Sequence, residues 1–241
     1  SPDLVGLAEE LTPVSWRPSY VLELPEDPDD LRFGDARGHS RLRRAVNAAA
    51  RAGVTIRQAE TLVDLRAWYG LYLETMRWHC LPPRSFRFFQ AVWDNLGSRD
   101  LMRLLLAERY EAGKPTMLAG SMFLRFGRTV FYAFNGRRRE ELSRHPNDLI
   151  QWQAIHEATS EKFRRYDLGE VPTGNLGLDR FKRKWGATTT QLYRYYYPAP
   201  REPVDGSYKS DGHLRGLVNR CWQALPLAMT VVVGGVVYEY L

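Results

Sequence analysis

The residues with the clearest chemical potential lie in one segment, Gly174–Gly186, which reads Gly-Asn-Leu-Gly-Leu-Asp-Arg-Phe-Lys-Arg-Lys-Trp-Gly. Helical spacing inside it brings Asp179 near Lys182 and Arg183. Three apolar residues could anchor one face of this short helix: Leu178, Phe181 and Trp185. A cation held at the border of such an apolar wall can stabilise the oxyanion that develops during acyl transfer. The alternative is a short solvated helix with an aromatic anchor, because runs of charged residues usually face water.

This segment needs a scaffold, and the strongest strand signals precede it in the chain. Three runs are joined by turns short enough for hairpins and predict an antiparallel meander: Leu101–Glu108, Thr116–Arg125 and Thr129–Asn135. Further strands are predicted at 20–24, 54–58, 166–169 and 191–197, and helices at 39–52, 62–78, 85–96 and 148–163. The order of elements predicts an α+β fold, with one mixed, mostly antiparallel sheet flanked by helices.

One pattern in the segment is specific. Gly-Leu-x-x-Phe-Lys-x-x-Trp-Gly, following a Tyr-Asp-Leu-Gly strand, resembles the Fem family, the peptidyl aminoacyltransferases that build peptidoglycan cross-bridges. Each half of a Fem protein has the GNAT acyltransferase fold, and the resemblance runs from about Trp16 to about Tyr197, over the second half only. It implies a GNAT-like domain that forms an amide bond on a cell-envelope (peptidoglycan) precursor.

The resemblance also implies site residues, position by position. Phe181 and Lys182 match the Phe-Lys pair of the family, whose lysine is understood to stabilise the transition state. Tyr132 matches a tyrosine that faces the acceptor substrate. Arg77 matches the arginine of a Thr-x-x-Arg pattern that binds a phosphate of the nucleotide-linked precursor, although Trp-His-Cys replaces the usual charged, glycine-bearing turn after it. Arg84 is an alternative phosphate ligand.

The loop after the meander bears on the donor. Coenzyme-A-dependent GNAT enzymes carry there a Gln/Arg-x-x-Gly-x-Gly/Ala loop, whose backbone amides bind the pyrophosphate at a helix N-terminus. Here Asn135–Glu140 is followed by a detour to Pro146-Asn147-Asp148, and the second and third glycines are missing. This counts against acyl-CoA and fits the Fem pattern, whose donor is an aminoacyl-tRNA.

Two groups of residues in this loop have alternative interpretations. Arg137, Arg138 and Arg139 could neutralise phosphates of RNA, or could form an exposed basic turn. Asn147 is predicted to cap the helix that follows, with direct substrate binding as the alternative.

Composition limits the partners and cofactors. The chain of 241 residues has a formal net charge of +6 and a pI near 9.4, which favours an anionic partner such as RNA, a phosphate-bearing substrate or an acidic membrane surface. Nucleotide-binding, metalloprotease and serine-hydrolase motifs are absent, and the histidines lack metal-ligand spacing, so we predict no cofactor and no metal. The two cysteines lie far apart, which favours a reducing compartment, and we expect a cytoplasmic location that includes the inner face of the membrane.

The chain divides into four predicted parts. Residues 1–17 are a linker or the remnant of a preceding domain, 18–197 the transferase domain, 198–213 a linker and 214–241 an apolar tail. No charged residue occurs between Cys221 and Tyr238. The apolar run is interrupted and shorter than the roughly 20 residues of a spanning helix. We therefore expect residues 221–241 to pack on protein or to make a peripheral membrane contact.

Two other functions fit the sequence. One is a GNAT-type N-acyltransferase that uses acyl-CoA on an envelope or exopolysaccharide sugar. The other is a non-catalytic binding half of a two-domain protein, which the intact Phe-Lys pair argues against and the absent first half favours. No carboxylate stands out as general base: Asp167 and Glu170 flank the segment, and deprotonation assisted by the substrate is equally open. Lys184 is expected to face away from Lys182 and to matter little.

Overall fold

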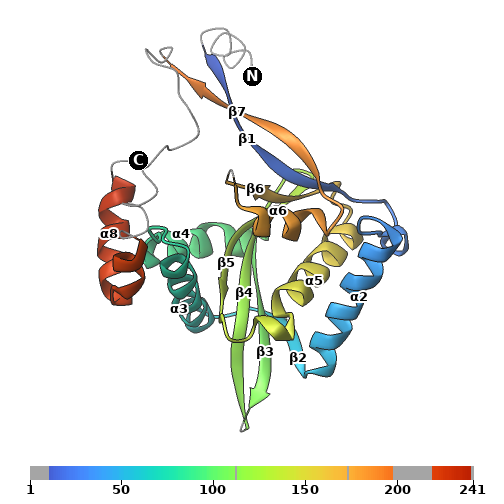
Figure 1. Cartoon of the computed structure of the whole chain (residues 1–241), viewed down its shortest axis with the longest axis horizontal. Helices are drawn as coiled ribbons and strands as arrows, with labels where there is room; N and C mark the ends of the chain where they lie inside the picture. Colours follow the sequence, from blue (N-terminus) through green and yellow to red (C-terminus); the bar gives the residue numbers. More distant parts are fainter. Residues whose placement is uncertain (1–10, 112, 173, 198–218, 240–241) are drawn as a thin grey trace.

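The sheet organises the molecule, as the computed structural model shows (Figure 1). The described residues are 11–197, apart from 112 and 173, and 219–239. They contain a seven-stranded sheet in the order β2-β3-β4-β5-β6-β1-β7. Its strands are β1 (Thr12–Glu23), β2 (Val54–Gln58), β3 (Met102–Glu111), β4 (Lys114–Phe126), β5 (Thr129–Arg137), β6 (Arg165–Glu170) and β7 (Thr188–Tyr196). The predicted mixed, mostly antiparallel sheet is confirmed.

The sheet contains one parallel pairing, between β5 and β6. The β3–β4–β5 meander is antiparallel, as predicted, whereas β5 and β6 run parallel. The parallel pairing covers only Thr129–Phe131 of β5 against Arg165–Asp167 of β6. Beyond these residues the two strands share no ladder, and their carboxyl ends leave a gap in the hydrogen bonding of the sheet.

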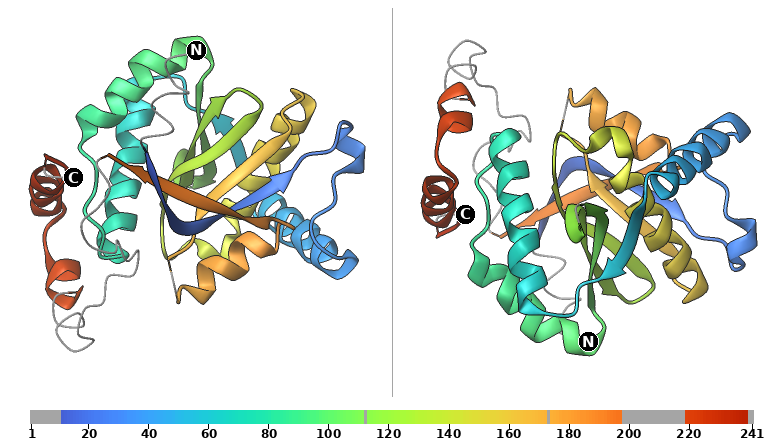
Figure 2. Two further views of the ribbon diagram at one scale, coloured as in Figure 1. Left: turned by 90° about the horizontal axis from the view of Figure 1, so that it is seen from above. Right: turned by 90° about the horizontal axis from the view of Figure 1, so that it is seen from below.

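Helices cover both faces of the sheet. They are α2 (Ala36–Arg51), α3 (Leu62–Trp78), α4 (Phe86–Leu96), α5 (Pro146–Ser160), α6 (Leu176–Arg183) and α8 (Leu227–Glu239), with short 3-10 turns at Pro28–Asp30, Gly97–Arg99 and Leu142–Arg144. Strand alternation divides the core: Leu105 and Ala107 pack with α2 and α5, whereas Leu104 and Leu106 pack with α3 and α4. The result is a three-layer arrangement (Figures 1 and 2).

Close packing fixes α3 on the sheet. A capping box of Thr61 and Asp64 starts this helix. Its backbone then lies directly on β5, since a Cβ added at Gly136 would be 2.6 Å from the backbone nitrogen of Tyr72. The end of β5 is therefore held against the carboxyl-terminal half of α3.

The first strand is longer than predicted. We expected residues 1–17 to be a linker or remnant, but β1 begins at Thr12 and pairs with β7 from Thr12–Tyr196 onward. Pro13 and Pro18 obscured this strand in the sequence, because proline usually ends one. The structure tolerates Pro18 at a register shift between Ser15 and Pro18. Residues 1–10 and the predicted linker at 198–213 lie outside the described residues.

The tail contains helix α8, which lies outside the α3–α4 layer, on the side away from the sheet (Figure 2). Leu227 and Val231 pack against the core cluster of α3 and α4. Gly234 makes the contact close, since a Cβ there would be 2.1 Å from the Pro83 carbonyl oxygen. Among the described residues no helix has the length and apolarity needed to cross a membrane.

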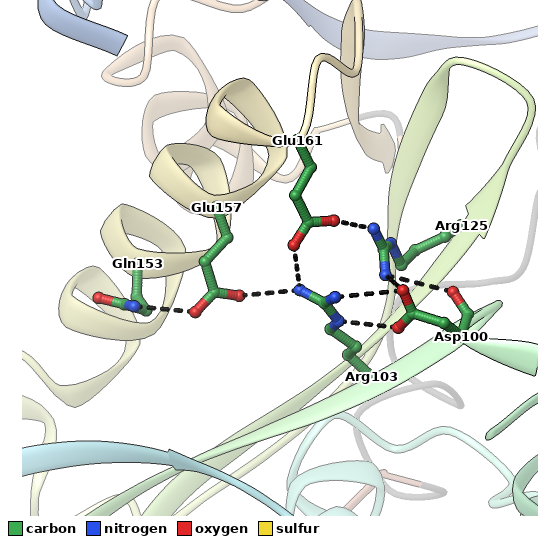
Figure 3. A network of polar contacts seen from close by, with 6 residues as sticks. All are labelled: Asp100, Arg103, Arg125, Gln153, Glu157 and Glu161. Carbon is green, nitrogen blue, oxygen red and sulfur yellow. Dashed lines mark hydrogen bonds and ion pairs between the residues drawn. The ribbon is translucent and has the colours of Figure 1, made fainter. Parts of the chain in front are cut away.

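An ion-pair network ties α5 to the sheet (Figure 3). Arg125 of β4 is buried and bonds both Asp100 and Glu161. Arg103 of β3 pairs with Asp100 at 3.0 Å and with Glu157 of α5 at 3.6 Å. Because every carboxylate faces an arginine, the network is a structural clamp that fixes α5 along the strands that lead to the site.

Candidate functional site

Lys182 lies at the carboxyl end of β6, where that strand pairs with β1. Asn175 caps α6 by accepting from the Leu178 N–H. Lys182, near the end of this helix, is only 3% exposed and reaches β6. Its Nζ donates to the carbonyl oxygens of Gly169 at 2.8 Å and Glu170 at 2.9 Å. The predicted position at the border of an apolar wall is thus wrong in one respect, since the ammonium group is buried.

Two opposing effects set the charge of this buried ammonium group. Burial lowers the pKa of Lys182 to about 8, while the carboxylates of Asp167 and Glu170 act in the opposite direction. The group is therefore still mostly charged at neutral pH. An ammonium has three donors, and the two carbonyls use two of them. The third donor is the one that could meet a developing oxyanion, and a substrate would have to reach it at a side chain that is 3% exposed.

The rest of the segment fixes α6. Asp179 pairs with Arg183 at 2.9 Å, as helical spacing predicted, but its other partner is the hydroxyl of Tyr20 and not Lys182. Trp185 is fully buried and packs edge-on against Phe33 at 5.1 Å. Phe181 is half-buried, and its ring lies 4.7 Å from the Nζ of Lys184.

Lys184 is not the indifferent residue that the sequence suggested. Its Nζ lies 2.5 Å from Oδ1 of Asp148, a buried carboxylate in the first turn of α5. This ion pair joins α6 to α5 across the site. Replacing Lys184 would leave Asp148 buried without its partner, so Lys184 is unsuitable as a neutral control.

The first turn of α5 differs from the prediction as well. Asn147 does not cap the helix: Pro146 is the first helical residue, and His145, with φ of +55° and no side-chain cap, precedes it. Proline favours the first helical position, which moves the start to Pro146 and makes Asn147 the second residue. Oδ1 of Asn147 instead accepts from Nδ2 of Asn135 at 3.1 Å.

The first turn of α5 is therefore closed to an anion. Pro146, Asn147 and Asp148 are all buried. Proline has no N–H to donate, and the N–H groups of Asp148 and Leu149 both donate to the His145 carbonyl, at 3.1 and 3.2 Å.

Tyr132 lies on β5 near its divergence from β6. It packs against the core and its ring lies 5.8 Å from that of Phe123. Burial raises the pKa of Tyr132 to about 12, an effect that Arg137, Ser121 and Gln151 partly oppose. The phenol therefore stays protonated at neutral pH and can donate a hydrogen bond to a substrate, but it cannot serve as a base.

A basic pocket of about 280 Å³ lies where β5 and α3 end. Its lining residues are Glu74, Thr75, Arg77, Trp78, Arg137, Arg139, Glu140 and Gln223. The hydroxyl of Thr75 accepts from the Arg137 N–H at 3.0 Å, which holds the strand end to the helix. The guanidinium of Arg139 lies 4.6 Å from the centre of the Trp78 ring. An arginine-rich pocket of this size can hold a phosphate group.

The structure brings together some of the predicted phosphate ligands and separates others. Arg77, Arg137 and Arg139 share the pocket. Arg138 turns away, and its Nε donates to the Met117 carbonyl at 2.9 Å. Arg84 lies outside, between the rings of Phe88 and Tyr238, at 4.6 and 4.3 Å from their centres. Sequence reasoning missed Gln223, because only folding brings the tail to α3.

Comparisons with known proteins identify relatives that share this fold. A family model described as an acetyltransferase (GNAT) domain matches residues 36–183. The structure of FemX aligns with a TM-score of 0.66 and 15% identity, over 79% of this chain and 66% of that chain. A search of curated proteins found no match.

Two further solved structures are similar. The C-terminal domain of a putative lysylphosphatidylglycerol synthetase from Agrobacterium fabrum aligns with a TM-score of 0.54 and 12% identity, over 80% of this chain and 64% of that one. The structure of L-PGS from Bacillus licheniformis aligns with a TM-score of 0.57 and 11% identity, over 92% of this chain and 70% of that chain. The aligned region spans slightly less than two thirds of FemX and of the Agrobacterium domain. At these identities the likeness concerns the fold, and at that level the Fem-like GNAT interpretation is confirmed.

Proposed function

The chain belongs to the acetyltransferase (GNAT) domain family and is an acyltransferase, and we propose that it transfers an aminoacyl group from aminoacyl-tRNA to an amine of a cell-envelope precursor. The observation that carries this proposal is the closed first turn of α5, formed by buried Pro146, Asn147 and Asp148. Such a turn cannot offer the amide cradle that the pyrophosphate of an acyl-CoA requires. The resemblance to Fem proteins and the similarity to FemX support a tRNA-borne donor, which we expect to be used in the cytoplasm.

In the proposed reaction, the acceptor amine attacks the ester carbonyl carbon of the aminoacyl group. A C–N bond forms, the carbonyl π electrons move to oxygen, and the ammonium of Lys182 stabilises that oxyanion. The ester C–O bond then breaks. The proton lost by the amine is transferred to the leaving ribose oxygen, and Tyr132, as a neutral phenol, orients the acceptor.

The surroundings favour a base supplied by the substrates. Oδ1 of Asp167 accepts from the Ser19 hydroxyl at 2.5 Å and from the Gly169 N–H at 2.7 Å. Glu170 accepts from the indole N–H of Trp16 at 2.6 Å and pairs with Arg17 at 3.7 Å. Both carboxylates thus have fixed structural partners, which supports proton transfer between amine and ribose oxygen within the bound substrates.

The donor is tested directly by titration calorimetry with acetyl-CoA, and by mass spectrometry of an amino-bearing precursor fraction incubated with charged tRNA. We expect no heat from micromolar acetyl-CoA, and an aminoacyl mass increase that needs both tRNA and protein. A micromolar acetyl-CoA complex would contradict the proposal and favour the N-acyltransferase alternative. No heat from acetyl-CoA together with no product from charged tRNA would favour the non-catalytic binding half.

We further propose that the basic pocket holds a phosphate group of the acceptor. Arg139→Met removes one charged donor, worth about 1.5–3 kcal/mol, so KM for a phosphate-bearing acceptor should rise roughly tenfold to a hundredfold with little change in kcat. Arg138→Met is the control, because Arg138 is next in sequence, bonds Met117 and does not line the pocket, although it pairs at 4.0 Å with Glu140, which does. Steady-state kinetics in which both variants change KM equally would exclude the pocket as the phosphate site.

A further inference from the structure

Helix α8 has one apolar face packed on the protein and another that is exposed. The exposed face carries Met229, Val232, Val233 and Val236, whose exposed fractions are 52%, 68%, 39% and 52%. Their spacing of i, i+3, i+4 and i+7 makes them neighbours on one side of the helix. From Met229 to Val236 no charged or hydrogen-bonding side chain interrupts this face, and a contiguous exposed apolar face marks an interaction site.

Three arginines lie around α8, while the helix itself ends at Glu239. Arg84 stacks on the ring of Tyr238 near the end of the helix, and Arg220 is exposed shortly before its start. Arg77 of α3 donates to the Leu225 carbonyl, two residues before α8, at 3.3 Å. An apolar face flanked by arginines and a tyrosine complements a lipid surface with acidic headgroups.

The basic pocket and α8 are built on one stretch of chain. Gln223 lines the pocket, and its amide donates to the Trp78 carbonyl at 2.9 Å. Helix α8 starts four residues later, at Leu227. The arginine pocket and the start of α8 are therefore close neighbours.

We propose that the exposed face of α8 docks on an anionic lipid surface, so that the arginine pocket meets an anionic group of the acceptor at the level of the lipid headgroups. With 13 residues the helix is about 20 Å long, shorter than the roughly 30 Å hydrocarbon core, and lies along the surface. We commit to a lipid surface and not to a protein partner, because the charged groups that flank the face are arginines, which match acidic headgroups. The assignment of the pocket rests on the proposed function, whereas the docking itself does not.

Co-sedimentation with vesicles tests the docking without any transfer reaction. The full chain should bind vesicles of phosphatidylcholine mixed with phosphatidylglycerol, and bind phosphatidylcholine alone at least tenfold more weakly. Val232→Ser/Val236→Ser should weaken binding to the anionic vesicles at least tenfold, because it removes apolar contact without adding charge. High salt should weaken binding of the wild-type chain.

The control is Val63→Ser, since Val63 is an exposed valine on α3, 77% exposed and outside this face. It should leave vesicle binding unchanged, and circular dichroism should show that both variants remain folded, as expected for exposed positions. Equal losses in both variants, or wild-type binding that ignores lipid charge, would overturn the proposal. So would a dimer, seen by light scattering, that the Val232→Ser/Val236→Ser variant dissociates. Failure of vesicle binding would leave the donor experiments unaffected, so the two proposals can fail separately.

Discussion

Lys182→Met is expected to lower the turnover of acyl transfer by a factor of about 10² to 10³, the range found when one oxyanion donor is removed. The substitution keeps the length of the side chain but removes the buried ammonium that bonds Gly169 and Glu170. If the charge acts on the transition state, kcat should fall more than acceptor affinity. Single-turnover transfer with saturating donor measures the effect.

The matched control is Arg180→Met, because Arg180 is an exposed cation on the same helix. Turnover of this variant should stay within about twofold of wild type, as surface substitutions are usually near neutral. Thermal unfolding separates chemistry from folding, because Lys182→Met also leaves two carbonyls without their donor. A Lys182→Met variant that is folded and fully active would show that the lysine is structural.

The pH profile distinguishes two roles for Lys182. A lysine that stabilises an oxyanion must be charged, so the rate should fall as pH rises through about 8, the pKa that burial gives this group. A lysine that acted as general base would have to be neutral, and the rate would rise over the same range. Lys182→Arg should remove this limb while recovering little activity, since a guanidinium stays charged but does not reproduce a compact ammonium.

Gly136→Ala is expected to be strongly destabilising, although it adds only one methyl group. The new Cβ would lie 2.6 Å from the Tyr72 nitrogen and 2.9 Å from the Leu71 carbonyl carbon, and backbone atoms cannot move aside. We expect a loss of about 3 kcal/mol in the free energy of unfolding, or roughly 6–12 °C in Tm for a domain of this size. Circular dichroism melting measures it.

The control for Gly136→Ala is Gly70→Ala on α3, where an added Cβ meets nothing within 4 Å. It should raise stability by up to about 1 kcal/mol, because alanine favours the helix. A Gly136→Ala protein as stable as wild type would mean that β5 does not lie against α3. If the stability falls as expected, the position of Arg137 beside Thr75 should be lost with it.

The local elements were predictable because their signals are local. Helix α3 was predicted at its observed bounds, and the meander was predicted from short turns between apolar runs. What failed depends on tertiary context. The sequence could not show that Pro18 sits at a register shift in a strand, nor that Lys184 meets a buried carboxylate of another helix.

The site was partly predictable for the same reason. The segment that holds Lys182 was found from its own pattern, but its burial depends on β6, whose carbonyls accept from it. All three pocket arginines were identified from the sequence, but Arg77 was predicted to bind the nucleotide-linked precursor and Arg137 and Arg139 to bind RNA. Only the packing of Gly136 on α3 brings them into one pocket.

The pairing of β1 with β7 has a consequence for the order of folding. It joins Thr12 to Tyr196, so β1 cannot pair with β7 until nearly the whole domain has been synthesised. The meander with α3 and α4 needs no such wait, because its contacts span short stretches of chain. During synthesis this half can form first, while β1 is left with exposed edges on both sides. Misfolding by edge-to-edge association is therefore most dangerous before β6 and β7 leave the ribosome.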